Sequence, residues 1–275
     1  MKIVSVGEIT IDHYLRQRQR YVGGISLNFA VNAKRSGADT VSLISCVGDG
    51  AEGQTVLDTL QREGVDHAHV YVMPGDTAVY ELEVTDSAEG IVPAGGYRAN
   101  VLRQLVLDQR SAAFIMAHDI LVTMYGQFMP EVLLDQLLLP AKRIKRVVDF
   151  GDCKNGRHDM FSAELFDQIE LAFITGDEQA IAALRPFVER SRCQFVVTLG
   201  AAGSVALTPE KRFEQAAIGV DRPVDTNGCG DAFQAAFTVS YFQDGDLQTA
   251  LRRGALRAAE VITHYGSFSQ EGWAY

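Results

Sequence analysis

The 275-residue chain is 47% hydrophobic, with a net charge of −10 and a pI near 5.1. This length and composition suffice for a large buried core, in one α/β domain or in two smaller ones. The acidic balance and the lack of a basic run argue against nucleic acid or anionic membranes as partners. No apolar run reaches the about 18 residues of a membrane span.

The opening residues and the cysteines favour a cytoplasmic protein. Residues 1–9 predict a strand, because they lack the basic start and the long apolar stretch of a signal peptide. The cysteines are scattered and have no metal-ligand spacing to histidine, so we expect isolated buried thiols in a reducing compartment. These cysteines are Cys46, Cys153, Cys193 and Cys229.

Short apolar runs alternate with amphipathic stretches along the chain. The runs predict strands and the amphipathic stretches predict helices. Continuous apolar strands separated by helices are typical of a parallel sheet covered on both faces, which binds ligands beyond the carboxyl ends of its strands. In chain order, strands are expected at 2–7, 40–48, 119–124, 146–151, 171–176 and 194–200, and helices at 28–37, 53–64, 129–144 and 231–242.

An acidic residue and then a glycine pair follow the first strand. Asp12 closes the run "GEITID", where a carboxylate at the end of a central strand can accept hydrogen bonds from hydroxyls. Gly23 and Gly24 permit close approach of a ligand, and Asn28 can donate to and accept from a sugar hydroxyl. The alternatives are a solvated loop acid and an ordinary glycine turn with an asparagine at the helix start.

Residues 77–86, "TAVYELEVTD", break the pattern because apolar and polar residues alternate there. Such alternation predicts a half-exposed strand. The segment is either an edge strand or a flap that rests over a site and excludes water.

The strand predicted at 194–200 leads into a further pair of glycines. Gly200 and Gly203, with the hydroxyl of Thr198, fit contacts to the ribose or phosphates of a nucleotide. The same residues also fit a plain hairpin.

The stretch "DTNGCGDAFQAAF", residues 225–237, holds the most informative turn. Gly228 and Gly230 allow successive N–H groups to converge on an anion, and the helix predicted from Asp231 onward directs its positive end to the same point. The result is a backbone cup for a phosphate, with a carboxylate beside it. The alternative is that Asp231 only caps the helix.

These motifs, in this order, resemble the ribokinase-like (PfkB) carbohydrate kinase family over essentially the whole chain. The carboxyl-terminal signature stands as "DTNGCGD", with Cys229 in place of the usual alanine, and the amino-terminal signature is present in Gly23, Gly24, Asn28 and Ala30. The resemblance implies one kinase domain over residues 1–275, with a three-layer α/β/α fold, a mainly parallel central sheet and a small β lid. It also implies transfer of the γ-phosphate of ATP to a primary hydroxyl of a sugar.

The resemblance assigns roles to residues of this sequence. Asp231 corresponds to the general base, and the backbone of Gly228, Cys229 and Gly230 to the anion hole. The remaining assignments are Asp12, Gly23, Gly24 and Asn28 as sugar contacts, Thr198, Gly200, Gly203 and Asn227 as nucleotide contacts, and Asp225 as a site for a monovalent cation such as K⁺.

The sequence departs from the family at its magnesium motif. The family usually carries Asn-x-x-Glu after a late strand, whereas this chain has "TGDE", with Thr175 in place of the asparagine and Glu178 kept. Mg²⁺ prefers oxygen ligands and retains waters, so Glu178 is expected to support the ion through water.

A second departure concerns the lid. Only residues 13–22 separate Asp12 from Gly23, which implies a reduced lid built from about 13–22 and 77–98. This compact version most resembles the fructoselysine 6-kinases, which phosphorylate a sugar attached to an amino acid. The alternatives are another sugar or nucleoside kinase of the family, or a nucleotide- or sugar-binding protein without catalysis. The half-exposed lid strand could also pair with a second subunit in a homodimer.

Overall fold

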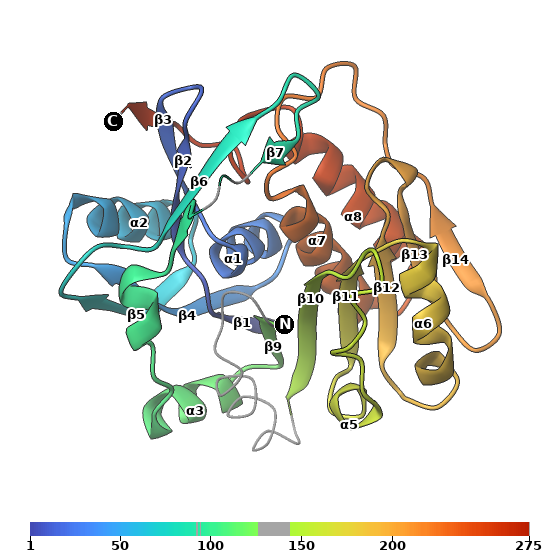
Figure 1. The fold of residues 1–275 in the computed structure, drawn as a ribbon. Helices are drawn as coiled ribbons and strands as arrows, with labels where there is room; N and C mark the ends of the chain where they lie inside the picture. Colours follow the sequence, from blue (N-terminus) through green and yellow to red (C-terminus); the bar gives the residue numbers. More distant parts are fainter. Residues whose placement is uncertain (92, 94, 126–143, 275) are drawn as a thin grey trace.

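Two β-sheets and the helices around them form the structure, a computed structural model that describes residues 1–91, 93, 95–125 and 144–274 (Figure 1). The helix expected at 129–144 lies outside the described residues, except for its last position. Each of the strands predicted from the apolar runs is present.

The central sheet has nine strands in the order β14-β13-β12-β11-β10-β9-β1-β4-β5. All neighbours pair in parallel except β12 with β13 and β13 with β14, which form an antiparallel edge. The strands are β1 (Lys2–Val6), β4 (Thr40–Gly48), β5 (Asp66–Met73), β9 (Ile120–Met124), β10 (Lys145–Asp152), β11 (Leu171–Thr175), β12 (Gln194–Thr198), β13 (Ser204–Leu207) and β14 (Arg212–Gln215).

Helices cover both faces of the central sheet, because the inner strands are apolar on both sides. Ile3 of β1 lies in a core cluster with residues of α1, α2, α7 and α8, whereas its neighbour Val4 lies in a cluster on the opposite face with residues of α3 and η1. The helices are α1 (Ile25–Arg35), α2 (Ala51–Arg62), η1 (Asn100–Gln104), α3 (Gln109–Met116), α5 (Ala163–Phe166), α6 (Glu178–Val188), η2 (Gly200–Ala202), α7 (Cys229–Asp244) and α8 (Leu247–Val261). The predicted three-layer architecture with a mainly parallel sheet is confirmed.

The second sheet is smaller and contains the predicted lid segments. Its order is β15-β3-β2-β6-β7, with β8 also paired to β6. Because β6 has neighbours on both sides, the interpretation of residues 77–86 as an edge strand is wrong. The strands are β2 (Thr10–Tyr14), β3 (Gln19–Gly23), β6 (Val79–Val84), β7 (Gly90–Ile91), β8 (Tyr97–Arg98) and β15 (Trp273–Ala274).

The structure corrects the prediction for Asp12. β1 ends at Val6, and Asp12 lies in the middle of β2, so it belongs to the second sheet and not to the end of a central strand. No pattern in the sequence indicated β15, which is only two residues long and lies at the other end of the chain.

Two general expectations can be compared with the described residues. Among them, no helix is long and apolar enough to cross a membrane. All four cysteines are free; Cys46, Cys153 and Cys193 are buried as expected, whereas Cys229 is only half-buried.

Candidate active site

The amino-terminal turn of α7 contains the glycines of the carboxyl-terminal signature. Gly228 caps the helix with a φ of +75°, a left-handed conformation that favours glycine. A Cβ at this position would also lie 2.1 Å from Cβ of Ser267, so the close approach of that residue requires glycine as well. The turn from Gly228 to Gly230 is half-buried, which leaves its backbone accessible at the positive end of a 16-residue helix.

Asp231 follows this turn and does not cap the helix, so the capping alternative is wrong. Its carboxylate instead accepts a hydrogen bond of 2.8 Å from Nδ2 of Asn28, which lies in the first turn of α1. Only 9% of Asp231 is exposed. Burial raises the pKa of Asp231 well above its usual value, the Asn28 hydrogen bond opposes this shift, and the nearby Asp149, Glu8 and Asp12 add to it.

Asp12 faces the same region from β2. Its Oδ1 accepts from the Thr10 hydroxyl at 2.6 Å, and its Oδ2 accepts from Nδ2 of Asn227 at 3.0 Å. Burial raises the pKa of Asp12 to about 6, although both hydrogen bonds favour the ionised form. Asn227 thus connects Asp12 of the second sheet to the turn before α7.

The glycine pair makes room for these groups. A Cβ at Gly23 would lie 2.2 Å from Oδ2 of Asp12, and a Cβ at Gly24, where φ is +99°, would lie 2.7 Å from the backbone of Ile9 and Thr10. The atoms that approach both glycines closely are therefore those of the protein itself. Glycine is needed here to seat the Asp12 carboxylate and to start α1.

Asp225 is fully buried and is the centre of a hydrogen-bond network. Its carboxylate accepts from the Tyr14 hydroxyl at 2.5 Å, from the Gly266 N–H at 3.0 Å and from the Asn227 N–H at 2.9 Å. These neighbours are donors, whereas a monovalent cation requires oxygen acceptors around it. The surroundings of the Asp225 carboxylate therefore do not fit a cation, and we assign it no step that involves one.

Two tyrosines of the second sheet face the same site. The strand register places Tyr80 beside Asp12 on one side and beside Tyr97 on the other, so their side chains share one face of the sheet. Burial raises the pKa of Tyr80 to about 12, and the carboxylates of Asp12, Glu8 and Asp231 contribute to the shift. Tyr80 is therefore within electrostatic reach of all three acids.

Glu8 is the third of these acids, and it was not recognised from the sequence. It lies in the loop after β1, and its Oε2 accepts from the Ile25 N–H at 3.3 Å. Burial raises the pKa of Glu8 to about 7, although this hydrogen bond and one from the Tyr97 hydroxyl favour the ionised form. The signal in the sequence was an acid between an apolar strand and a second, polar strand.

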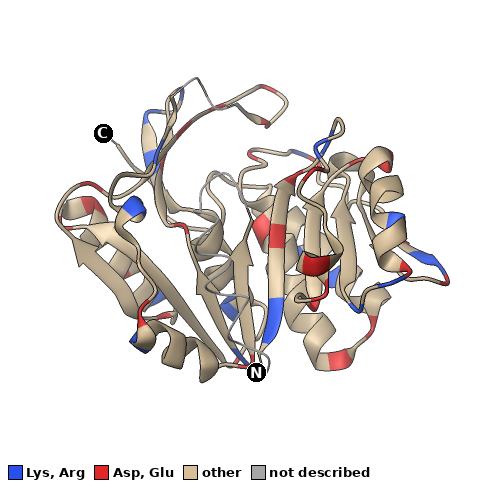
Figure 2. Ribbon diagram, turned by 60° about the horizontal axis from the view of Figure 1, so that its bottom comes forward, with Lys and Arg blue, Asp and Glu red and all other residues tan. Residues whose placement is uncertain are grey.

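The site therefore gathers several buried carboxylates. The ion pairs that form among the described residues lie elsewhere, and acidic and basic segments are otherwise interspersed over the ribbon (Figure 2). Burial makes the ionised form of these carboxylates costly, although the nearby His13 lowers the pKa of Asp12. The arrangement consequently favours a ligand that donates hydrogen bonds or carries positive charge.

Of the residues expected to contact a nucleotide, Thr198, Gly200 and Gly203 lie at or just after the carboxyl end of β12, whereas Asn227 lies before α7. The hydroxyl of Thr198 is 3.2 Å from that of Thr175 on the neighbouring β11. The chain then turns through Gly200, with a φ of +60°, into an antiparallel hairpin with β13, so the hairpin alternative is confirmed. A Cβ at Gly203 would lie 2.1 Å from the Gln215 carbonyl oxygen, so this glycine is required by the hairpin itself.

Glu178 begins α6 at the same edge of the central sheet. Both of its carboxylate oxygens accept from the Arg212 guanidinium at 2.9 Å, and 70% of its side chain is exposed. Within the described part of the chain, no group of three or more His, Cys, Asp or Glu residues could hold a metal ion. Glu178 is thus paired with a cation of the protein, and its expected role in supporting Mg²⁺ through water stays a prediction.

Comparison with solved structures places the fold among ribokinase-like kinases. The ribokinase of Arabidopsis thaliana, solved with ribose and ATP, superposes with a TM-score of 0.81 at 18% identity, over 97% of this chain and 94% of that one. A nucleoside kinase of Methanocaldococcus jannaschii gives a TM-score of 0.76 at 19% identity, over 97% and 93% of the two chains. At these identities the comparison establishes the fold.

Residues 1–151 and 161–271 match the pfkB family of carbohydrate kinases. The chain therefore belongs to this family, whose members are phosphotransferases with an alcohol group as acceptor. The fructosamine kinase FrlD of Bacillus subtilis (strain 168) is 28% identical over 100% of this chain and 94% of its own length. The fructoselysine 6-kinase of Escherichia coli (strain K12) is 27% identical over 97% of this chain and 99% of its own length.

Proposed function

We propose that this protein transfers the γ-phosphate of ATP to a primary hydroxyl of a sugar-amine, in the manner of a fructoselysine 6-kinase. The observation that carries the proposal is the position of Asp231. It is a buried carboxylate held by Asn28 in the first turn of α7, directly after a half-buried glycine turn.

The chemistry follows from that position. As the acceptor oxygen attacks the γ-phosphorus, Asp231 takes the hydroxyl proton, the new O–P bond forms, and the bond from the γ-phosphorus to the bridging oxygen breaks to release ADP. A positioned base contributes about 10²–10⁴ in rate. The raised pKa of Asp231 makes it a better proton acceptor than an exposed carboxylate.

The backbone at Gly228, Cys229 and Gly230 supplies the complementary charge. N–H groups in the first turn of a helix lack partners within the helix and favour an anion. A donor of an oxyanion-type hole is typically worth about 3–4 kcal/mol. We assign these groups to the phosphoryl unit in transfer, for which the Cys229 N–H would have to leave or share its 3.3 Å bond to the Thr226 carbonyl.

Asn28 is suited to contact both the base and the acceptor. Its Nδ2 donates to Asp231, while its Oδ1 is buried and has no hydrogen-bond partner among the described residues. A hydroxyl of the acceptor would satisfy that oxygen. With Asp12 beside it, the pair supplies acceptors for adjacent sugar hydroxyls.

The buried acids support a sugar-amine over a neutral sugar. A protonated amine next to the sugar would compensate the charge of Asp12 and Glu8, whose pKa values burial raises to about 6 and about 7. Tyr80 adds an aromatic face, which attracts cations. Two of the relatives described above also bear names that specify fructosamine or fructoselysine.

We propose that Thr198 and Gly200 contact the nucleotide. Thr198 and Gly200 lie at the carboxyl edge of the sheet, where ligands of parallel sheets bind. Both donor nitrogens of Asn227 are used within the protein: its backbone N–H donates to Asp225, and its Nδ2 donates to Asp12 and Tyr14. We therefore regard Asn227 as a link between these residues.

A divalent cation, which we propose to be Mg²⁺, would arrive with the phosphates of ATP. It prefers oxygen ligands and keeps several waters, so it does not need a dedicated cage of side chains. We also propose that the protein is cytoplasmic. A homodimer formed through the second sheet stays a prediction.

The test is turnover by the purified protein. ATP consumption is measured with fructoselysine, other glycated amino acids, fructose, ribose and nucleosides, for the wild type, Asp231→Asn and the surface control Asp58→Asn. We expect the highest kcat/KM with a glycated amino acid, a loss of about 10²–10⁴ in Asp231→Asn and no loss in the control.

The other outcomes separate the alternatives. Equal or better kcat/KM with ribose, fructose or a nucleoside would favour an ordinary sugar or nucleoside kinase and end the sugar-amine proposal. ATP binding without turnover on any acceptor would favour the catalytically inactive alternative.

A further inference from the structure

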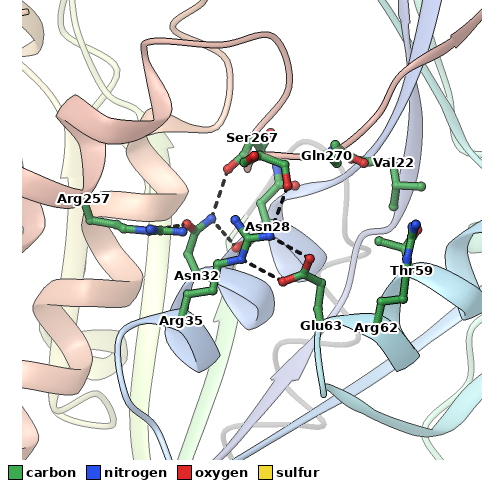
Figure 3. A network of polar contacts seen from close by, with 11 residues as sticks. Val22, Asn28, Asn32, Arg35, Thr59, Arg62, Glu63, Arg257, Ser267 and Gln270 are labelled. Carbon is green, nitrogen blue, oxygen red and sulfur yellow. Dashed lines mark hydrogen bonds and ion pairs between the residues drawn. The ribbon is translucent and has the colours of Figure 1, made fainter.

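Asn32 lies one helical turn after Asn28 on α1 and is fully buried. Its Nδ2 donates to the backbone carbonyl of Asn28 at 2.8 Å and to the carbonyl of Ser267 at 3.1 Å, while its Oδ1 accepts from Nε of Arg257 at 2.8 Å (Figure 3). One side chain thus joins the helix that carries Asn28, the segment after α8, and α8 itself.

Residues 265–270, the segment after α8, contact the site at several points. Ser267 lies directly against Gly228, and the Gly266 N–H donates to Asp225. Further along, Nε2 of Gln270 donates to the carbonyl of Val22 at 2.8 Å, just before the glycine pair. The bond from Asn32 to Ser267 therefore fixes α1 relative to the turn that precedes Asp231.

Arg257 determines the orientation of the Asn32 amide. Because Oδ1 accepts from the guanidinium, the two N–H bonds of Nδ2 must point to the carbonyls of Asn28 and Ser267. Only 12% of the Arg257 side chain is exposed, and its Nη1 also pairs with Glu260 at 2.6 Å. The guanidinium is thus held by Glu260 as well as by Asn32.

Burying an amide at position 32 has a cost in desolvation free energy. A buried amide loses its hydration, and an apolar side chain would fill the space between helices at lower desolvation cost. What the amide adds is direction, because its two N–H bonds and its oxygen are each directed at a different residue. That direction is transmitted to Asn28, whose side chain holds Asp231.

We propose that Asn32, oriented by Arg257, is a positioning residue for phosphoryl transfer: it holds Asn28 against Asp231 and Ser267 against the Gly228 turn. The inference rests on the proposed function, since it requires Asp231 to act as the base. Neither residue touches the reacting atoms, so each acts through Asn28 and through Ser267.

The decisive variant is Asn32→Asp. It preserves size and the acceptor for Arg257 but replaces both N–H donors by an oxygen, so the carbonyls of Asn28 and Ser267 lose their partner. We expect kcat to fall about 10- to 100-fold, because small displacements of catalytic groups have effects of this size. The KM for ATP and the KM for the acceptor should each change less than about threefold. Arg257→Met should show a smaller loss of the same kind.

The pH profile separates positioning from stability. If Asn28 no longer donates fully to Asp231, the pKa of that carboxyl rises, and the acidic limb of kcat/KM moves upward by about half a pH unit or more. In an Asn28→Ala background, Asn32→Asp should lose the part of its effect that passes through the Asn28 side chain and keep only the part that passes through Ser267, so the two losses should be clearly less than additive.

Arg62→Met is the matched control. Its Nη2 donates to Thr59 Oγ1 at 2.9 Å on α2, in the same region but outside this network, so kinetics and pH profile should match the wild type (Figure 3). Melting temperatures accompany every variant. Should Asn32→Asp fail to fold, the test is the acidic limb of the kcat/KM profile of Arg257→Met, which should also move to higher pH.

The outcomes are distinct. A lower melting temperature with unchanged kcat and an unchanged acidic limb would overturn the positioning role while leaving the proposed kinase intact. Full additivity of Asn32→Asp and Asn28→Ala would also overturn it. A wild type that transfers phosphate to no acceptor would refute both proposals together.

Discussion

Asn28 and Asp231 are 203 positions apart in the sequence, yet the side-chain amide of one donates a 2.8 Å hydrogen bond to the carboxylate of the other. Both are buried, and each belongs to a different signature of the family. The bond favours the ionised form of Asp231, whereas burial raises the pKa of that carboxyl. The reactivity of the proposed base is thus set by the balance of these opposing effects.

Removing this hydrogen bond should change the pH dependence of the reaction. In Asn28→Ala, the pKa of Asp231 rises further, because the contact that lowers it is lost. A base works only when deprotonated, so the acidic limb of kcat/KM should move to higher pH and kcat should fall about 10- to 100-fold at pH 7. The measurement is a pH profile of phosphoryl transfer from pH 5 to 9, and an unmoved limb would exclude Asn28 as the partner of the base.

The choice of Asn28 and Asp231 as site residues could be predicted from the sequence. The glycine turn and the acid at the start of an apolar helix, with the second signature at Gly23 to Ala30, indicated both Asn28 and Asp231 as site residues. The alternating segment at 77–86 indicated a strand, although the sequence left open whether it is an edge strand or a flap over the site. Each of these signals is local, because it depends on residues close together in the chain.

The network around Asp225 could not be predicted, because its partners are distant in sequence. Tyr14 lies 211 positions before Asp225, and Gly266 lies 41 positions after it. Nothing in the run around Gly266 distinguishes it from a solvated loop. The assignment of Asp225 to a cation was based on the family resemblance alone. In the structure its carboxylate accepts hydrogen bonds from Tyr14, Asn227 and Gly266.

Glu8 should make the stability of the protein depend on pH. Its pKa is raised from 4.5 to about 7 in the folded state, so the folded state binds this proton more tightly than the unfolded one. Protonated Glu8 therefore stabilises the folded state fully at pH values below 4.5. This contribution, about 3 kcal/mol, is lost as the pH rises through about 7. Glu8→Gln should therefore gain stability relative to the wild type as pH rises from 5.5 to 8.

Urea unfolding of both proteins at several pH values measures this difference. Glu83→Gln, at an exposed position of β6, provides the control and should parallel the wild type. A difference between Glu8→Gln and the wild type that stays constant over this range would show that Glu8 does not titrate there.

Gly23 should be essential for the acceptor site but not for the fold. The Cβ of Gly23→Ala would lie 2.2 Å from Oδ2 of Asp12, so the carboxylate must move and lose its bond to Asn227. We expect KM for the acceptor to rise about tenfold or more, with KM for ATP nearly unchanged. Gly219→Ala, where a Cβ meets no atom within 4 Å, is the matched control. An equal rise in both KM values would point to a general disturbance instead.

Cys229 should be dispensable, although it lies in the proposed anion hole. Burial raises the pKa of its thiol to about 11, so the group is protonated and a poor nucleophile near pH 7. The proposed role of this position uses only its backbone, which alanine also supplies. Cys229→Ala should therefore keep kcat/KM within about twofold of the wild type. A loss of about tenfold or more, with an unchanged melting temperature, would mean that the sulfur atom itself contributes to the reaction.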